Sequence, residues 1–567
     1  MNKKLFLTLL VGCAVALTGC NKKISQFDSK YFSVVPEPLE VNGSKVPGTV
    51  TGKIPAKVFV KKAEVTVTPR LLVGDDNSGS IVTLASTPYV FQGEKVRGNN
   101  PVVSYDKGGY ITIPFSYDYV DGMEDAELYL DFNVKQGSKQ YTLPMVKVTE
   151  GINTTATIAD VASTNPAIAP DKFQRIINEK YTADIKFLIN QANIRDGELR
   201  TEAMKDFNSK LANANADSSR QIKEINISSY ASPEGGVEFN EKLASKREKN
   251  TSAYLEKHLK NEKISDFGEL TAQFTAQDWE GFQKLVAESN IQDKELILSV
   301  LSMYKDPEVR EQEIRNLSSI FDQLTDEILP QLRYSRLTAS IDVIGKSDDE
   351  IKEAFKNNPK SLSVDELLYC ATLTDNNDEK AEIYQTAANI YSNDYRAFNN
   401  LGACQFIAKD FTSASANFKK AASLQSNGES NMNLGLISML EGDYSKANEL
   451  LGNAGSIDEV KEALGVYYLK MGDNNAAVKA FEDSKTNNAA LAQIVSKDYS
   501  KAKRTLAAIE APDATTYYLM AVLGARTNNE KMLESNLRQA IKLDNSLAKK
   551  AIKDVEFTNF NLSNIIK

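Results

Sequence analysis

Apolar and polar residues alternate along three stretches in the first third of the chain. Every second residue is apolar in 63–67, 111–117 and 128–134. A period of two predicts strands with one buried face and one solvated face. Clusters of Gly, Asn and Pro between the stretches, as in 98–101, predict turns. We therefore expect an antiparallel β-sandwich of immunoglobulin type over residues 31–149, a length that suits one such domain.

The alternation stops between residues 150 and 170. This part of the chain is small, hydroxyl-rich and prolyl, and it ends in Pro166-Ala167-Ile168-Ala169-Pro170. Such a composition favours neither a helix nor a strand. We expect 150–170 to be a linker.

Residues 171–350 contain stretches with the two-residue period of strands and stretches with the 3.6-residue period of helices, which predicts an α+β domain. Strands are expected at 183–190, 225–230 and 339–344, and a helix capped by Asn240 is expected after the turn at 231–236. A helical insertion is expected at about 261–328. It holds the sole tryptophan, Trp279, which would serve either as a core anchor of the insertion or as a platform for a ligand.

An Asp or Asn followed four residues later by Ala recurs through residues 360–560. The pairs are Asn377 with Ala381, Asp410 with Ala414, Asp443 with Ala447, Asp473 with Ala477, and Asp498 with Ala502. Leu-Gly pairs at 401–402, 434–435 and 464–465 share one position of the repeat. A spacing near 34 residues is typical of tetratricopeptide repeats, in which paired helices stack into an all-α solenoid. We expect five or six repeats.

A solenoid of this kind presents a concave face on which protein segments bind. We predict that Asn399, Asn400, Asn433 and Tyr467 line that face. The alternative is a solenoid that serves as a structural spacer.

The N-terminus has a basic start, an apolar run and Leu17-Thr18-Gly19-Cys20. The first 19 residues predict a signal peptide, and the sequence around Cys20 resembles a lipobox, which implies acylation of Cys20 and a lipid-anchored linker at 20–30. Acyl chains would hold the chain in a bilayer. The absence of acidic residues before Asp28 favours a periplasm-facing protein. The alternative is an ordinary secretory signal followed by a chance cysteine.

Residues 183–260 resemble the peptidoglycan-associating domain of the OmpA family in their strand-helix-strand order and in the spacing of Gly, Asn, Leu and Arg. In that family an aspartate in the turn and an arginine fifteen residues later hold the wall peptide. Ser232 stands at the aspartate position and Arg247 at the arginine position. The resemblance implies peptidoglycan binding by Ser232, Glu234 and Arg247, with Glu234 replacing the missing carboxylate. The alternative is that Arg247 forms a surface ion pair and that wall binding is lost.

Charge and residue counts narrow the function further. The net charge is −9, so no basic surface for nucleic acid is expected. One histidine, no phosphate-binding loop and no nucleophile elbow predict no enzyme activity, catalytic residue, metal or cofactor. Outside the signal and anchor, only Cys370 and Cys404 remain. We expect them to be buried thiols, with a disulfide between stacked helices as the alternative.

The whole arrangement resembles a family of outer-membrane lipoproteins that combine OmpA-like and tetratricopeptide modules. It favours a non-enzymatic, periplasm-facing tether and scaffold that binds peptidoglycan and protein partners. A second hypothesis is an accessory subunit of an outer-membrane assembly that acts by protein contacts alone. A third is a surface-exposed adhesin or nutrient-binding lipoprotein.

Overall fold

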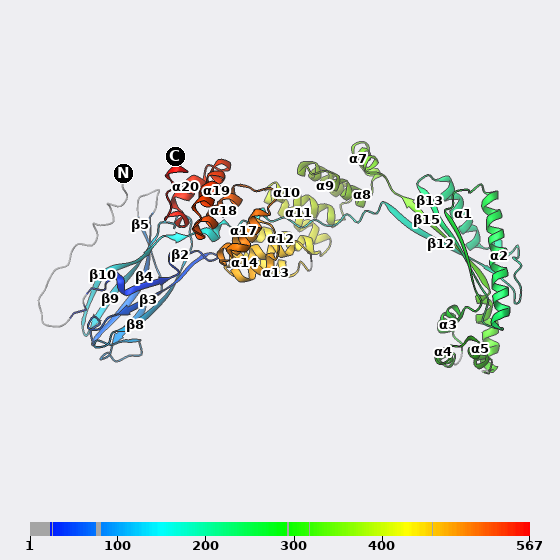
Figure 1. Ribbon diagram of the computed structural model, residues 1–567, viewed down its shortest axis with the longest axis horizontal. Helices are drawn as coiled ribbons and strands as arrows, with labels where there is room; N and C mark the ends of the chain where they lie inside the picture. The colour runs from blue at the N-terminus through cyan, green and yellow to red at the C-terminus, as the bar shows by residue number, and fades with distance from the viewer. Residues whose placement is uncertain are drawn as a thin grey trace. The chain divides into compact units, whose positions relative to one another are not determined.

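The computed structural model describes residues 23–24, 26–74, 81–291, 294–316, 318–455 and 457–566. The predicted signal peptide and the predicted lipidation site Cys20 lie outside these residues. The chain forms two compact units (Figure 1). Unit 1 contains Met1–Pro170 and Thr374–Lys567, and unit 2 contains Asp171–Leu373. The β-rich region and the helical repeats therefore belong to one unit, and unit 2 is inserted between them in the sequence.

The first part of unit 1 is a sandwich of two main sheets. Its strands are β1 (Phe32–Val35), β2 (Leu39–Glu40), β3 (Lys45–Ile54), β4 (Ala63–Gly74), β5 (Ile81–Ala85), β6 (Tyr89–Gly93), β7 (Val102–Val103), β8 (Gly109–Asp118), β9 (Glu127–Gln136), β10 (Lys139–Glu150) and β11 (Ile152–Asn153). One sheet has the order β1-β3-β8, and the other follows β10-β9-β4-β6-β7 with β5 beside β4. The three alternating stretches lie in β4, β8 and β9, which confirms their prediction as strands.

The apolar faces of both sheets share one core, which includes Val50 and Ile113 from one sheet and Val65 and Phe132 from the other. Two strand pairs, β6 with β7 and β2 with β11, are parallel. The immunoglobulin type of the sandwich stays a prediction.

Residues just after Cys20 also belong to this core, although 20–30 was expected to be a lipid-anchored linker. Ile24 and Phe27 are buried, and the Phe27 ring lies 4.7 Å from that of Phe132. The Ile24 amide donates to the Tyr141 hydroxyl at 3.2 Å. Isolated apolar residues give no periodic signal, so the sequence could not assign them to the sandwich.

Unit 2 contains a four-stranded sheet with helices. Its elements are β12 (Ile176–Lys186), α1 (Glu202–Ala216), β13 (Arg220–Tyr230), α2 (Val237–Asn261), β14 (Glu269–Thr275), α3 (Trp279–Glu288), α4 (Lys294–Met303), α5 (Pro307–Asn316), α6 (Ser318–Gln323), β15 (Tyr334–Ile344), α7 (Asp348–Asn357) and α8 (Val364–Cys370). The strand order is β12-β15-β13-β14, with β13 and β14 parallel. Apolar residues of α1 and α2 share one core with β12, β13 and β15, which makes an α+β layer pair.

Three expectations for unit 2 need correction. The predicted insertion at 261–328 contains β14, which is part of the sheet, so the helical addition starts at Trp279. The residues of β14 alternate between polar and apolar, with Leu270, Ala272 and Phe274 apolar, so the strand pattern was present in the sequence although the strand is mostly exposed. Asn240 lies inside α2, whose N-cap residue is Gly236. The strand expected at 183–190 instead spans Ile176–Lys186.

The rest of unit 1 is a stack of helical hairpins. Its helices are α9 (Asn377–Ile390), α10 (Tyr395–Ile407), α11 (Phe411–Leu424), α12 (Gly428–Leu440), α13 (Tyr444–Gly452), α14 (Val460–Met471), α15 (Asn474–Phe481), α16 (Asn487–Val495), α17 (Tyr499–Ala507), α18 (Ala514–Arg526), α19 (Glu530–Leu543) and α20 (Leu547–Lys553). This helical, tetratricopeptide-like region confirms the predicted repeat architecture. The compact unit takes in the repeat range only from residue 374, and α8 belongs to unit 2.

The recurring residues of the repeats have local structural causes. Asp410, Asp443, Asp473 and Asp498 each cap the second helix of a hairpin by accepting a hydrogen bond from a backbone N–H three residues later. A Cβ atom at Gly465 would lie 2.6 Å from the ring of Phe481. A larger residue there would push the two helices of the hairpin apart, which explains the recurring glycine.

Candidate functional site

Three asparagines occupy equivalent positions on the first helices of the hairpins. Asn400 lies on α10, Asn433 on α12 and Asn488 on α16, each ten residues before the aspartate that caps the following helix. All three side chains are buried. We call them the asparagine row, and the side of the repeats on which they lie the first-helix face.

Residues 154–170, which we call the docked segment, lie on this face. Each asparagine of the row binds one residue of the segment through both backbone groups: Oδ1 accepts from the N–H, and Nδ2 donates to the C=O. The pairs are Asn400 with Ala169 at 2.8 and 2.9 Å, Asn433 with Ala167 at 2.7 and 2.9 Å, and Asn488 with Asp160 at 3.0 and 2.8 Å. A side-chain amide has the same donor and acceptor as a peptide group, so these contacts depend on the backbone of the segment.

Asn399, next to Asn400, adds contacts to those of the asparagine row. Its Nδ2 donates to the Ala167 carbonyl at 3.0 Å, and its Oδ1 accepts from Asn433 at 3.1 Å and from the Ser430 hydroxyl at 3.1 Å. Three of the four residues predicted to bind protein segments thus hold a segment of their own chain. The fourth, Tyr467, packs its ring edge-on against Tyr468, with 5.6 Å between centroids.

Most side chains of the docked segment that face the repeats are small, and Val161 and Ile158 are the larger ones. Ala159, Val161 and Ala167 belong to the core of the repeats, and Ala169 is buried beside them. Ile168, by contrast, is exposed. The segment connects two parts of the chain, as a linker does, but it is packed and hydrogen-bonded along its length. Asparagine is a poor helix former, so its recurrence inside helices was the one signal in the sequence.

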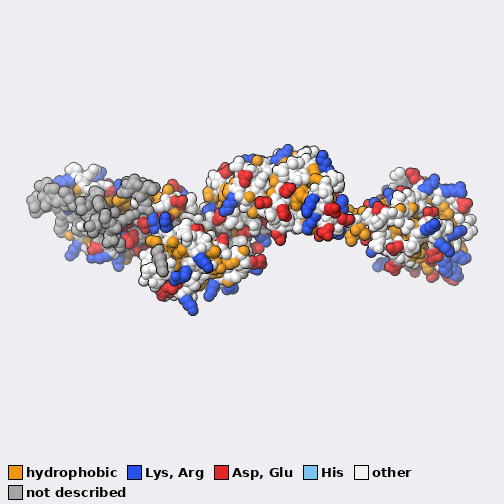
Figure 2. All heavy atoms as spheres, turned by 90° about the horizontal axis from the view of Figure 1, so that it is seen from above, with side chains coloured by type: hydrophobic (Ala, Val, Ile, Leu, Met, Phe, Trp, Pro, Cys, Tyr) orange, Lys and Arg blue, Asp and Glu red, His pale blue; other side chains and the backbone are white. Residues whose placement is uncertain are grey.

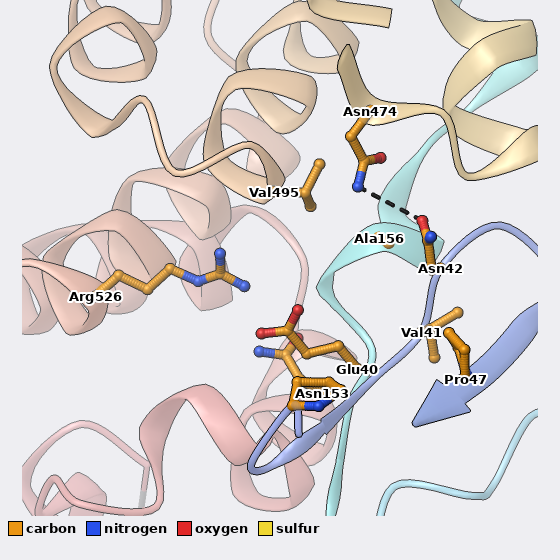
Figure 3. Close-up of a pocket in the computed structure, with 10 residues that line it drawn as sticks. Glu40, Val41, Asn42, Pro47, Asn153, Ala156, Asn474, Val495 and Arg526 are labelled. Carbon is orange, nitrogen blue, oxygen red and sulfur yellow. Dashed lines mark hydrogen bonds between the residues drawn. The ribbon is translucent and has the colours of Figure 1, made fainter. Parts of the chain in front are cut away.

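Sandwich, docked segment and repeats also meet at a cavity of about 230 Å³ with a mixed polar and apolar lining. Figure 3 shows Glu40 and Arg526 on its walls, with Asn474 donating to Asn42 at 3.5 Å. Arg526 forms an ion pair with Glu556, and the two side chains are only 12% and 6% exposed. These polar side chains form a network that extends to Asn153 on β11 and so joins the β-rich and helical parts of unit 1.

Glu556 is the centre of this network. Its Oε1 also accepts from Asn153 Nδ2 at 2.8 Å and from the Thr155 hydroxyl at 2.6 Å. A buried carboxylate with several donors is fully compensated. The segment is thus fastened at its start as well as along the asparagine row.

The second predicted site lies in unit 2, and its arginine is buried. Arg247 on α2 is 1% exposed. Its guanidinium donates to the carbonyls of Gln191 at 3.0 Å, Tyr230 at 2.7 Å and Leu188 at 3.3 Å, and it lies 5.0 Å from the Phe187 ring centre. Burial lowers the pKa of Arg247 to about 10, which still leaves it charged at neutral pH. Arg247 is therefore buried on backbone carbonyls, and among the described residues it has no surface ion pair of the kind given as the alternative.

Glu234 pairs with a different arginine. Arg333 donates to it from Nε and Nη2, both at 2.9 Å, and both side chains are 10% exposed. The Ser232 hydroxyl donates to Glu234 Oε1 at 2.9 Å. The structure brings Ser232 and Glu234 together, but the charge partner of Glu234 is Arg333. Nothing in the spacing of the sequence identified that residue.

The loop at 231–236 is held from two sides. Asn240 Nδ2 donates to the carbonyls of Ser232 and Gly235 at 3.1 and 2.9 Å. From the other side, Gln277 Nε2 donates to Gly235 at 2.9 Å. Trp279 is partly buried and packs edge-on against Phe282 of the core of the helical addition, with 5.6 Å between centroids. Pro233 and Glu234 of the loop line one small cavity with Trp279 and Phe282, so the addition lies against the predicted wall-binding site.

The remaining candidate chemistry is sparse. Cys370 and Cys404 are free, buried thiols, and burial raises the pKa of both, that of Cys404 to about 11. The described residues contain no group of three or more His, Cys, Asp or Glu side chains that could hold a metal ion. None of the described helices is long and apolar enough to cross a bilayer. On the face in Figure 2, acidic and basic side chains are interspersed over both units.

No family model and no curated protein matches the chain. Several solved structures match part of it. The APC/C hetero-tetramer Cut9-Hcn1 is 15% identical, with a TM-score of 0.31, over 35% of this chain and 43% of that one. A tetratricopeptide repeat protein from Parabacteroides merdae is 11% identical, with a TM-score of 0.29, over 37% and 91% of the two chains. PilF of Pseudomonas aeruginosa is 18% identical, with a TM-score of 0.28, over 38% and 99%.

The chain thus spans less than half of the first of these structures. At such scores the likeness carries no functional argument. The repeat assignment rests on the capped hairpins and on their spacing.

Proposed function

We propose that this protein is a non-enzymatic scaffold of the bacterial envelope, an accessory subunit of an outer-membrane assembly that acts through protein contacts. In this proposal, acylated Cys20 anchors it to the outer membrane facing the periplasm. Unit 2 keeps an OmpA-like architecture without binding peptidoglycan. The repeats and the sandwich supply the docking surfaces.

The state of Arg247 carries the proposal. An arginine that holds a wall peptide must offer its guanidinium to a ligand carboxylate, usually through two parallel hydrogen bonds. Here the guanidinium is buried and bonded to three backbone carbonyls. A ligand would have to displace these bonds and leave buried carbonyls unpaired, which is costly.

The carboxylate side of the site supports the same conclusion. With serine at position 232, Glu234 is the only acidic residue of the loop at 231–236 that could neutralise the ammonium group of a wall peptide. Arg333 already binds both oxygens of Glu234. The helical addition that begins at Trp279 also lies against the loop, because Trp279 and Phe282 line one small cavity with Pro233 and Glu234. We infer that the helical addition replaced ligand binding with an internal contact.

The first test is co-sedimentation of a soluble form, beginning after Cys20, with purified peptidoglycan sacculi. We expect it to stay in the supernatant, whereas a wall-binding OmpA-family domain as positive control should pellet. If the soluble form pellets and an Arg247→Lys variant does not, wall binding is retained and the proposal is wrong.

The second test concerns partners. Membranes are digested with lysozyme to remove peptidoglycan, solubilised in mild detergent and analysed by size-exclusion chromatography. We expect the protein to elute in a complex that survives digestion. Elution as a lone monomer would contradict the scaffold. Protease treatment of intact cells separates the periplasm-facing form, which should be protected, from a surface adhesin.

A further inference from the structure

The docked segment has the chemistry of a bound peptide. Its first part contains two short 3-10 helices, Thr155–Ile158 and Val161–Ser163, and residues 164–170 have no regular secondary structure. Its backbone is held by the asparagine row. Ala159, Ala167 and Ala169 make small buried contacts with the repeats, Val161 is buried in the same core, and Ile158 packs against it. Ile168, between Ala167 and Ala169, is 42% exposed and does not anchor the segment.

The repeats do not depend on the segment for most of their packing. Their core is filled by their own large side chains, such as Phe406, Phe418 and Phe481, which are all buried. If the segment left, the asparagine row would face water and its amides would be hydrated rather than unpaired. The segment can therefore leave while the helical hairpins stay folded.

We propose that residues 157–170 are a resident, exchangeable ligand of the first-helix face, and that an extended segment of a partner protein takes their place. This inference rests on the proposed scaffold function and names the chemistry of the partner segment. In the partner segment, two residues with the spacing of Ala167 and Ala169 must have free backbone N–H and C=O groups. Their side chains must be small, because Ala167 and Ala169 are each 1% exposed. The residue between them can be of any size.

The covalent connection of the docked segment to unit 1 explains why the segment occupies the first-helix face when no partner is present. Because the segment belongs to the same chain, its local concentration at the asparagine row is high, so a free peptide competes poorly. A partner would succeed when it also contacts another surface of unit 1. The arrangement protects the asparagine row from non-specific segments.

Hydrogen exchange of the complete soluble protein tests exchangeability directly. The amides of Asp160, Ala167 and Ala169 donate to side chains of the row, so they exchange when the segment opens. We expect them to exchange at least about 10-fold faster than the central amides of α10 and α12, because local opening costs less than unfolding. Exchange of both sets at one common slow rate would mean a permanent contact and would overturn the proposal.

Peptide binding tests the recognition. The probe is a fluorescein-labelled synthetic peptide with the sequence of residues 157–170, measured by fluorescence polarisation. Ala167→Glu with Ala169→Glu places large charged groups where the repeats leave no room, and should release the resident segment. We expect this variant to bind the peptide at least about 10-fold more tightly than the unaltered protein, a change of about 1.4 kcal/mol.

Two further variants complete the design. Ile168→Glu is the matched control, because this side chain is exposed, and it should bind the peptide no better than the unaltered protein. Adding Asn400→Ala and Asn433→Ala to the releasing variant should abolish binding. Circular dichroism shows whether each variant keeps its helices; if the releasing variant unfolds, hydrogen exchange alone decides. A folded releasing variant without peptide binding, or equal binding by the unaltered protein, overturns the proposal.

The outcomes separate this inference from the scaffold function. A complex that survives lysozyme digestion, with no peptide binding, leaves the scaffold standing and removes the exchange. Peptide binding by a protein that elutes as a monomer would support the exchange and contradict the scaffold function.

Discussion

Replacing Glu556 by alanine should destabilise unit 1 and leave unit 2 unchanged. The carboxylate of Glu556 receives hydrogen bonds from Arg526, Asn153 and Thr155. The substitution leaves the Arg526 guanidinium, 12% exposed, without its counter-charge. Removing one partner of a buried ion pair costs about 3 to 5 kcal/mol. Slight solvent access to Arg526 places the expected loss near the lower figure.

Urea denaturation measures this loss, and the chain offers an internal reference. Trp279 is the only tryptophan and lies in unit 2, so its fluorescence follows that unit alone. Far-ultraviolet circular dichroism follows the helices of both units, so the part of its transition that the fluorescence does not share reports on unit 1. With a slope of about 3 kcal/mol per molar urea, a loss of 3 kcal/mol lowers the midpoint by about 1 M. We expect this shift in circular dichroism and an unchanged midpoint in fluorescence.

A matched variant makes the result specific. Glu449 lies on α13 and is exposed, so Glu449→Ala removes the same charge without breaking a buried pair. Its effect should stay within about 0.5 kcal/mol. The reasoning is refuted if the two variants shift the circular dichroism midpoint equally, or if Glu556→Ala also shifts the fluorescence midpoint by a similar amount.

Three other measurements test separate parts of the structure. Gly465→Ala places a methyl group 2.6 Å from the Phe481 ring. The overpacking, partly offset by helix propensity, should lower the free energy of unfolding by about 1 to 3 kcal/mol and lower the thermal midpoint with it. Gly452→Ala, with open space around it, should leave the midpoint unchanged. Cys404, whose pKa burial raises to about 11, stays a protonated thiol at pH 8 and should resist iodoacetamide until urea unfolds unit 1, whereas rapid labelling of the folded protein would contradict its burial. Arg333→Ala leaves a buried carboxylate unpaired, so the tryptophan fluorescence midpoint should fall by about 1 M urea, and an unchanged midpoint would show that the pair is not needed for folding.

The sequence was informative where neighbours along the chain decide the structure. The strands β4, β8 and β9 follow from a period of two, which places alternate side chains on one face. The hairpins follow from capping aspartates and from glycines such as Gly465, whose reasons lie within one repeat. These features depend on residues that are close in the sequence, so they can be recognised in a single chain without its tertiary contacts.

The sequence could not decide where residues 150–170 lie or what Arg247 binds. Ala167 is 266 positions from Asn433, and Asn153 is 403 positions from Glu556. Glu234 and Arg333 are 99 positions apart. A hydrogen bond depends on distance and direction in space, and no spacing in the sequence encodes a contact across hundreds of residues. Sequence periodicity therefore determined the strands and the repeats. Only the tertiary structure decided that the first-helix face holds its own chain and that Arg247 is buried against backbone carbonyls.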